Sequence, residues 1–455
     1  MRVLTSLFFL FFLISFPVFA ADKDFCGKFS ASDGETIEIS LEEAVRTAFE
    51  KNPDIKKSLS GIKKKKAEYR GAKSGFLPVI SAYFEYMRAD SPSSYLFKKI
   101  DQRKLPAGTN FNDPGNIKNY EAGISARIRL FNGGRTSGLK KIAGAGLDIG
   151  KIIADEVRNE TAFAVISTWY DLLNAEDMVK ISKESVKTVE EQVRITQVMF
   201  DGGSALKSDL LSLKARLSSV KADFLKAVNN CRLIKAELSS LIGLDPEIVI
   251  MAKDSSDIIP NVSGDYKSIV QQALLKRQYL KIVEKKVEIS KARYKMEKGR
   301  YLPTLDLKAD YYHDDSSMKF SENRQNYRAG VVLGWNLFDG FAREAALDKA
   351  FAEVLSAQEE KRKAVLQLKV EVRKAWFNMD LADKKLEVST IEKKEAEASF
   401  NLVKKQFSGG SAGITRYLEA ELARNRARIS ERRAFYEKKR ANVEMAKVIG
   451  LLSSL

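Results

Sequence analysis

The only histidine of the chain, His313, is followed directly by Asp314 and Asp315. Imidazole nitrogens and carboxylate oxygens can bind a metal ion or carry protons, so these residues are the first candidates for chemistry. One histidine and two adjacent acids lack the spaced further ligands of a metal site. The strand-like pattern before them places them near the tip of a hairpin. We therefore expect His313 to be a solvated loop residue and not a metal ligand.

Other catalytic patterns are absent from the sequence. It contains no phosphate-binding glycine loop, no zinc-type spacing of Cys and His, no nucleophile elbow and no dinucleotide-binding turn followed by an acid. The net charge of +17 arises from 77 Lys and Arg that are mixed with 60 Asp and Glu, which is typical of solvated helix faces. The sequence thus predicts no enzyme, no cofactor, no metal site and no nucleic-acid partner.

The first 20 residues have the pattern of a secretory signal peptide. Arg2 precedes an apolar run over residues 4–20, which ends in Val18-Phe19-Ala20 as a small-residue cleavage site. Residues 21–35 then form a polar tail. Because 30% of the chain is charged and the mean hydropathy is −0.26, we expect no other helix to anchor it in a membrane. Cys26 and Cys231 are too few for a disulfide framework, and whether they pair stays open.

Four segments alternate apolar and polar or small residues with the period of a β-strand. The clearest is Tyr327–Leu337, and similar alternation runs through Ile80–Tyr86, Tyr120–Phe131 and Leu305–Tyr312. Residues 89–118, between two of these segments, contain three prolines and two glycines and are predicted to be a loop. The four segments therefore form two hairpins whose strands each have one apolar face.

Long helices with coiled-coil spacing occupy most of the remaining chain. Ser40 and Glu43 form a capping-box pattern, and Pro53 suits the first turn of the next helix, which should end near Gly75. No proline occurs from Leu139 to Phe200, which predicts a helix of about 90 Å. Apolar residues recur every seven positions in three ladders: Val179, Val186, Val193, Phe200; Leu210, Leu217, Phe224, Cys231, Leu238; and Leu213, Val220, Ala227, Ile234, Leu241. Such ladders are typical of coiled-coil packing.

The whole arrangement occurs twice. Trp169, Phe200 and Gly202-Gly203-Ser204 recur 207 residues later as Trp376, Phe407 and Gly409-Gly410-Ser411. The predicted division is a first repeat over 36–254 (β-hairpin at about 77–131, helical tip at about 200–204), a linker over 255–264, and a second repeat over 265–455 (hairpin at about 302–338, tip at about 407–411). The fold class is α+β: mainly long α-helical coiled-coil hairpins with two β-hairpins, internally duplicated.

Four amphipathic strands indicate a membrane sheet that one chain cannot complete. Unpaired backbone groups at an open sheet edge cost several kcal/mol each in lipid, and the smallest membrane barrels have eight strands. Several copies must then pool their strands, although this reasoning leaves dimer, trimer and tetramer open. The alternative function is a non-channel periplasmic coiled-coil scaffold, which would have no use for such strands.

These features resemble the TolC family of outer-membrane efflux and secretion channels. The resemblance is carried by Leu41–Pro53, Phe76-Leu77-Pro78, Leu130–Arg135, Leu337–Gly340 and Phe407–Leu418, and it covers nearly the whole mature chain. It implies a homotrimer with a twelve-stranded β-barrel in outer-membrane lipid above a periplasmic α-barrel. It also implies a periplasmic adaptor (membrane fusion) protein and an inner-membrane transporter as partners, in a tripartite efflux pump or a type I secretion system. The cargo, whether drug, metal or protein, stays open.

The resemblance further implies roles for residues at the two helical tips. Contact with the adaptor is implied for Phe200, Gly202, Gly203, Phe407, Gly409 and Gly410, and a constriction or gate for Asp209, Arg416 and Glu419. Plain turn glycines and ordinary exposed charges are the simpler alternatives. Arg416 stands where the family pattern has a second acid, while Phe407 and Ala412 replace a tyrosine and an arginine that lock the closed state. The sequence therefore predicts a weaker and less cation-selective lock.

Aromatic residues in or next to the predicted strands are candidates for the membrane interfaces of the barrel. They are Tyr86, Tyr120, Tyr311, Tyr327 and Trp335, with plain strand packing as the alternative. The function expected from the whole sequence is a passive exit duct in the outer membrane with a large periplasmic portion. Substrates would be handed over by the adaptor and the inner-membrane transporter.

Overall fold

The computed structural model describes residues 35–253, 262, 264–320 and 322–455. The predicted signal peptide, Cys26 and most of the 255–264 linker lie outside these described residues. The helices and strands are, in chain order, β1 (Thr36–Ile39), α1 (Leu41–Lys51), α2 (Pro53–Ser74), β2 (Val79–Ala89), α3 (Pro92–Asp101), β3 (Ile117–Asn132), α4 (Arg135–Asp201), α5 (Lys207–Leu241), β4 (Val249–Ala252), α6 (Tyr266–Lys276), α7 (Gln278–Lys298), η1 (Gly299–Tyr301), β5 (Thr304–Asp315), η2 (Glu322–Arg324), β6 (Gln325–Gly334), α8 (Ala342–Ser408), α9 (Ile414–Ile449) and η3 (Leu452–Ser454).

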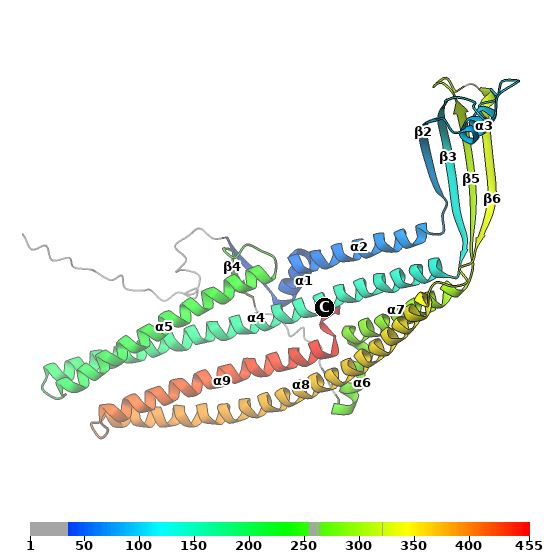
Figure 1. Cartoon of the computed structure of the whole chain (residues 1–455). Coiled ribbons are helices and arrows are strands. Elements are labelled where there is room, and N and C mark those ends of the chain that lie inside the picture. Colours follow the sequence, from blue (N-terminus) through cyan, green and yellow to red (C-terminus); the bar gives the residue numbers. More distant parts are fainter. Residues whose placement is uncertain (1–34, 254–261, 263, 321) are drawn as a thin grey trace, which may run out of the picture.

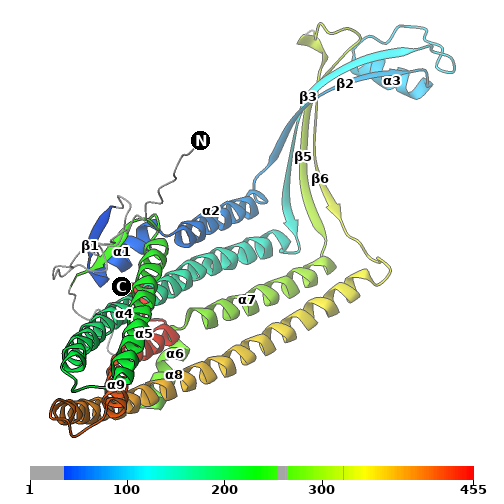
Figure 2. The same cartoon turned by 90° about the vertical axis from the view of Figure 1, so that its left-hand side faces the viewer.

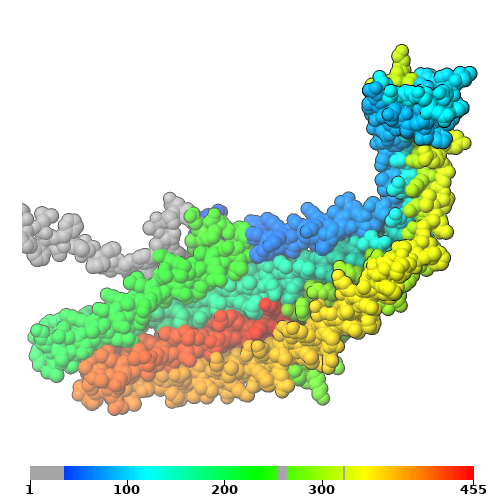
Figure 3. Space-filling model, viewed as in Figure 1, coloured from blue at the N-terminus to red at the C-terminus, as the bar shows by residue number. Residues whose placement is uncertain are grey.

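The molecule is long and bent, with a sheet at one end and helices leading away from it (Figure 1). The strands β2, β3, β5 and β6 stand at an angle to the helices and twist along their length, as the turned view shows (Figure 2). Helix α4 packs along α5, and helix α8 packs along α9. The two helical hairpins also lie against each other, through α4 and α9 (Figure 3). The predicted fold class is therefore confirmed: long helical hairpins, twice, joined to two β-hairpins.

The register of the four-stranded sheet places most of the apolar residues of each strand on one face. The strand order is β2-β3-β5-β6, all antiparallel. One row of directly opposed residues runs across it through Ala82, Ile124, Tyr311 and Tyr327. Opposed residues point to the same face and successive residues to opposite faces. We call the face of this row the apolar face. The polar face carries Glu121, Arg127, Lys308, Asp310 and Arg328.

Three sequence expectations about the strands and loops were wrong or incomplete. Residues 89–118 are not simply a loop, because α3 forms within them, with Pro92 in the first turn, where its missing N–H costs nothing. Strand β6 ends at Gly334, so Trp335 lies beyond it and donates its indole N–H to the carbonyl of Tyr301 at 3.1 Å. The short parallel pair of β1 and β4 was not predicted.

The helices follow the predicted signals closely. Ser40 accepts the N–H of Glu43 at 3.2 Å, while the Glu43 carboxylate accepts the N–H of Ser40 at 2.8 Å, so the capping box is confirmed. Helices α4 and α8 each contain 67 residues, about 100 Å at 1.5 Å per residue. On α5, both ladders are buried or half-buried, and Leu213, Cys231 and Leu238 are fully enclosed. The coiled-coil ladders of α5 are thus confirmed.

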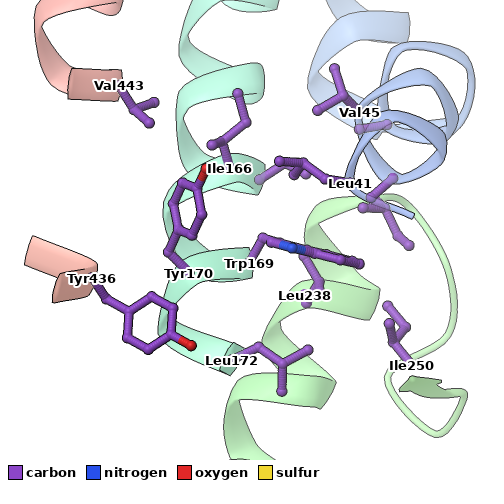
Figure 4. Close-up of a cluster of buried hydrophobic side chains, with 14 of the residues drawn as sticks. Leu41, Val45, Ile166, Trp169, Tyr170, Leu172, Leu238, Ile250, Tyr436 and Val443 are labelled. Atoms are coloured by element: carbon purple, nitrogen blue, oxygen red, sulfur yellow. The ribbon is translucent and has the colours of Figure 1, made fainter. Parts of the chain in front are cut away.

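The largest core surrounds Trp169 in the middle of α4 (Figure 4). Trp169 is 1% exposed and packs among Leu41 of α1, Leu238 of α5 and Ile250 of β4. Three segments distant in the sequence therefore meet on one side of α4. Its repeat counterpart Trp376 is only partly buried, in a second cluster, with its ring edge-on to Tyr266 at 6.0 Å between centroids.

Two glycines allow the chain to cross itself where the sheet meets the helices. Gly133 follows β3 and Gly299 follows α7, and their backbones touch. A Cβ atom on Gly133 would stand 1.9 Å from the carbonyl oxygen of Gly299, and one on Gly299 would stand 2.0 Å from that of Gly133. Any side chain here must push two backbones apart, so this crossing fixes how each hairpin joins its helices.

Replacing Gly299 with alanine is expected to destabilise the protein by about 1–3 kcal/mol, the usual range for overpacking. The backbone of Gly299 is right-handed helical, with φ −63, so the cost is steric and not conformational. Thermal unfolding of the purified variant measures it. Gly71→Ala on α2 is the matched control, because nothing lies within 4 Å of its Cβ position, and it should stabilise by up to about 1 kcal/mol. Equal unfolding temperatures for the two variants would contradict the close contact.

Candidate functional site

The two helical tips have the same backbone conformation. Helix α4 turns into α5 through Gly202 and Gly203, and α8 turns into α9 through Gly409 and Gly410. In the first tip the N–H of Ser204 donates to the carbonyl of Met199 at 2.7 Å. In the second the N–H of Ser411 donates to that of Gln406 at 2.8 Å. Gly203 and Gly410 both have φ +74. This is the left-handed helix cap that glycine adopts without steric cost.

The side chains of the predicted tip residues lie at the ends of these turns. Gly202, Gly203, Gly409 and Gly410 are exposed, and Phe200 and Phe407 are half-buried. Phe407 packs against the ring of Tyr417 at 5.2 Å between centroids. The glycine turns therefore present bare backbone to the surroundings, while each phenylalanine is partly held by its own hairpin.

Tyr417 is the centre of a small core beneath the second tip. Its side chain is fully buried against Phe400 and Val403, and its hydroxyl has no hydrogen-bond partner in the described part of the chain. Burial, together with the nearby charge of Glu421, raises the pKa of Tyr417 to about 12. The guanidinium of Arg424 lies 3.9 Å from the centroid of the Phe400 ring. The second tip thus carries aromatic packing that its twin lacks, since Leu210 occupies the position equivalent to Tyr417.

A buried charge one helical turn above Tyr417 joins the two helical hairpins. Glu421 of α9 is fully enclosed, and its carboxylate accepts two hydrogen bonds from Arg216 of α5, at 3.0 and 2.7 Å. The hydroxyl of Ser185 on α4 donates to the same carboxylate at 2.9 Å, and Asn425 donates a further bond. Because Ser185 and Arg216 belong to the first repeat, this cluster ties the first hairpin to the second.

The residues predicted to form a constriction are not brought together within one chain. Asp209 is half-buried at the start of α5, whereas Arg416 and Glu419 are exposed on α9. Neither Arg416 nor Glu419 makes an ion pair with any described residue. Sequence reasoning chose Glu419 and missed Glu421, although an acid at the i, i+4 spacing from Tyr417 on a packed helix face was a usable signal.

His313 is not the solvated loop residue expected from the sequence. It lies within β5 on the apolar face, where its ring meets Phe320 edge-on at 5.6 Å between centroids. Asp314 and Asp315 are completely buried. The expectation failed because β5 extends beyond Tyr312 to Asp315 and because neighbouring loops cover this end of the sheet.

The two acids are enclosed by cations from both hairpin loops and by an amide of β3. Asp314 accepts hydrogen bonds from Lys98 of α3 at 3.0 Å and from Asn119 at 2.6 Å. Asp315 pairs with Arg324 and lies 3.7 Å from the ammonium of Lys104. Among the described residues, no three His, Cys, Asp or Glu side chains group as a metal site. The acids thus hold loops in place.

The predicted interface aromatics divide into two groups. Tyr86 opposes Tyr120 and Tyr311 opposes Tyr327 in the register, so all four lie on the apolar face. The rings of Tyr86 and Tyr120 are 4.9 Å apart, and Tyr327 is 83% exposed. Trp335 is also exposed but lies beyond the end of β6. No helix in the described ranges is both long enough and apolar enough to cross a membrane.

The chain matches a family model and is similar to several known proteins. The family model described as outer membrane efflux protein matches residues 44–244 and 269–451. The alkaline protease secretion protein AprF of Pseudomonas aeruginosa is 26% identical over 200 residues, which are 42% of this chain and 40% of AprF. Protein CyaE of Bordetella pertussis is 21% identical over 388 residues, 84% of this chain and 78% of CyaE. The match to AprF therefore spans less than half of that relative.

The fold also has close structural neighbours. The crystal structure of the CmeC outer membrane channel of Campylobacter jejuni superposes with a TM-score of 0.77 at 15% identity, covering 96% of this chain and 93% of that one. A likeness over nearly the full length of both chains means that the bent arrangement of sheet and helices is shared.

Proposed function

This chain belongs to the outer membrane efflux protein family, and we propose that three copies of it form a passive exit duct through the outer membrane. The observation that carries the proposal is the four-stranded sheet, which has a continuous apolar face and an opposite polar face. A soluble sheet with nothing covering its apolar face would be unfavourable in water. A sheet with lipid on one face and water on the other satisfies both faces.

The edges of the sheet support the assembly of several copies. Strands β2 and β6 each pair on one side only within the described chain. An edge strand in lipid must pair its backbone groups, because no water is available to them. Pairing β2 of one copy with β6 of the next closes the ring, and three copies supply the twelve strands that the family resemblance implies.

An exposed apolar stripe on α8, formed by Phe377 and Val388, supports assembly of several copies through the helical part as well. Tyr170 and Ile181 on α4 are 4% and 6% exposed, and α9 packs beside α4, with the Tyr436 ring 6.5 Å from that of Tyr170. Their counterparts 207 residues later, Phe377 and Val388, are 57% and 66% exposed. The repeat relates α4 to α8 and α9 to α5. We expect α5 of a second copy to cover this stripe.

The proposed duct works without chemistry of its own. Among the described residues, the tips lie farthest from the sheet (Figure 1). We therefore assign Phe200, Gly202, Gly203, Phe407, Gly409 and Gly410 to contact with a periplasmic adaptor. Asp209, Arg416 and Glu419 would line the narrow entrance once three copies assemble. Tyr86, Tyr120, Tyr311 and Tyr327 would meet the lipid interfaces. An inner-membrane transporter would supply the energy, and the chain would not act as an enzyme.

Two adjacent valines test which face of the sheet meets lipid. Val331 lies on the apolar face and Val332 on the polar face, with 59% and 46% of their surfaces exposed. Lysine at position 331 should cost about 2–4 kcal/mol in the membrane, whereas lysine at 332 should cost about 1 kcal/mol or less, because it faces water. The measurement is urea unfolding of the protein reconstituted in lipid vesicles. Equal losses for Val331→Lys and Val332→Lys would contradict the assignment of faces.

The state of assembly separates the duct from the alternative scaffold. Native mass spectrometry of the detergent-extracted protein should give a trimer, and the trimer should conduct ions in a planar bilayer. Release of a monomer with the periplasmic fraction, without detergent, would favour the coiled-coil scaffold and refute the duct.

A further inference from the structure

Two pairs of like charges stand directly opposite each other on the polar face of the sheet. Glu121 of β3 opposes Asp314 of β5, and further along the same two strands Arg127 opposes Lys308. The Cβ atoms of such opposed residues lie about 4.5–5.5 Å apart, so like charges there repel and destabilise the sheet. Each pair therefore needs a counter-charge.

The acidic pair finds its counter-charge within the chain. Lys98 of α3 donates to Glu121 at 2.5 Å and to Asp314 at 3.0 Å. Tyr83 of β2 also donates its hydroxyl to Glu121 at 2.8 Å. One ammonium group thus lies between the two carboxylates, and their repulsion is removed inside the folded protein.

The basic pair has no such partner. Neither Arg127 nor Lys308 forms an ion pair or a side-chain hydrogen bond with any residue in the described ranges. Asp310 is the acid of the next row on this face, and it is opposed there by Arg328. Arg127 is exposed and Lys308 is half-buried. The counter-charge of this pair must therefore come from outside the described chain.

Hydroxyl groups beside the basic pair add further donors for an anion. Ser81 of β2 opposes Ser125 of β3 in the next row of the same face. One hollow on this face is lined by both serines and also by Arg127, Lys308, Asp310 and Arg328. Guanidinium, ammonium and hydroxyl groups are the donors from which phosphate and carboxylate oxygens accept hydrogen bonds. The hollow therefore has the composition of an oxyanion site.

Other charges along the polar face cancel. Toward the helices, Arg129 pairs with Asp306 at 2.9 Å. At the outer end, four acids of the strands and of residues 92–104 are matched by four bases of that segment: Glu85, Asp101, Glu121 and Asp314; Lys98, Lys99, Arg103 and Lys104. Each chain is thus left with two unbalanced positive charges on this face, at Arg127 and Lys308.

The width of the proposed barrel brings these charges close to its axis. Twelve strands about 4.8 Å apart and tilted by about 40° form a ring about 24 Å across between strand centres. A side chain that reaches inward by about 4 Å, which arginine and lysine exceed, then lies within about 8 Å of the axis, one Debye length at physiological ionic strength. An ion on the axis would therefore experience the positive field of all three copies.

We propose that Arg127 and Lys308 form an anion-binding ring inside the barrel, which favours the passage of anions and disfavours cations. Rings of arginine and lysine give anion and phosphate pores their selectivity in the same way. The inference rests on the proposed trimeric duct and names the class of substrate that this duct would favour. That class is small anions and molecules with phosphate or carboxylate groups.

Calorimetric titration of inorganic pyrophosphate into the purified trimer in detergent tests the binding. Arg127→Gln with Lys308→Gln should weaken the affinity at least about tenfold, because two charge-assisted hydrogen bonds are lost. The control, Lys63→Gln with Lys66→Gln, removes the same two charges from the exposed surface of α2 and should change the affinity by no more than about twofold. The charge-preserving swap Arg127→Lys with Lys308→Arg should retain binding. Equal affinities for the two glutamine variants would overturn the ring.

The ion selectivity of the duct tests the filter. Reversal potentials in a planar bilayer under a KCl gradient should show that the wild-type trimer passes chloride at least about threefold more readily than potassium. Arg127→Glu with Lys308→Glu should reverse this preference, although the charged residues of the tips are the same in both proteins. An unchanged preference in a conducting trimer would overturn the filter and leave the duct intact. Absence of a trimer, or of conductance in the wild type, would overturn the duct itself.

Discussion

Replacing Arg216 with alanine is expected to weaken the contact between the two helical hairpins by about 3–5 kcal/mol. Glu421 has no exposed surface, and Arg216 supplies its counter-charge through two hydrogen bonds. Without Arg216 the carboxylate stays buried with only Ser185 and Asn425 to bind it. A buried charge that loses its partner costs far more than an exposed one, because its desolvation is no longer offset.

Hydrogen exchange of the 417–425 segment of α9 measures this effect where it arises. A loss of 3–5 kcal/mol corresponds to exchange that is roughly 10²-fold to 4 × 10³-fold faster, at 1.4 kcal/mol per factor of ten. Lys214→Ala is the control, because Lys214 is exposed two residues away and donates only to Gln197, at 3.3 Å. It should change local stability by no more than about 0.5 kcal/mol.

Removal of both charges distinguishes an ion pair from simple loss of packing. The double variant Arg216→Leu with Glu421→Leu leaves no buried charge, and such replacements are often neutral in stability. We therefore expect it to recover most of the protection that Arg216→Ala loses. If the double variant exchanged as fast as the single one, the stabilisation would come from the packing of the arginine side chain and not from the pair.

The same cluster bears on the lock that the sequence predicts at the tip. The sequence predicted a weaker lock, because Phe407 and Ala412 cannot make the hydrogen bonds implied by the family resemblance. That prediction is still untested. The structure adds a tie between the hairpins at Glu421, a short distance above the turn. Any opening of the tip that separates α9 from α5 must break this tie or carry both helices together.

The features that the sequence predicted well are those that depend on residues close together in the sequence. Alternation along β3, for example, reflects two faces with opposite surroundings, and a shift of one residue would reverse them. The register confirms this along all four strands. The capping box at Ser40 and Pro53 at the start of α2 act within one helical turn, so no distant partner was needed to foresee them.

The features that were missed depend on partners far along the chain. Heptad spacing shows that a helix face is covered but not by which helix, and Arg216 is 205 residues from Glu421. The repeat gave no help, because Lys214 occupies the equivalent position and is exposed. Strands β1 and β4 have four residues each, too few to show a period. Helix α3 was not predicted, because the prolines of this segment are typical of a loop, whereas Pro92 lies in the first turn of a helix.

Replacing Trp169 with alanine is expected to destabilise the protein by about 3–5 kcal/mol, the usual cost of removing a large buried aromatic side chain. Trp169 is 1% exposed, and the residues around it come from α1, α5 and β4 (Figure 4). Because these elements can relax only together, the cavity should collapse poorly, which places the cost near the upper end of the range.

Its repeat counterpart provides the control within the same molecule. Trp376 is only partly buried, and its ring contact is with Tyr266 alone among the described aromatic pairs. Such an edge-on pair contributes about 0.5–1.5 kcal/mol beyond the buried area. Trp376→Ala should therefore cost clearly less than Trp169→Ala in thermal unfolding of the purified protein. Equal losses would mean that the two repeats carry equivalent cores. That result would contradict the difference between the two cores, because α1 and β4 pack against the tryptophan of the first repeat only.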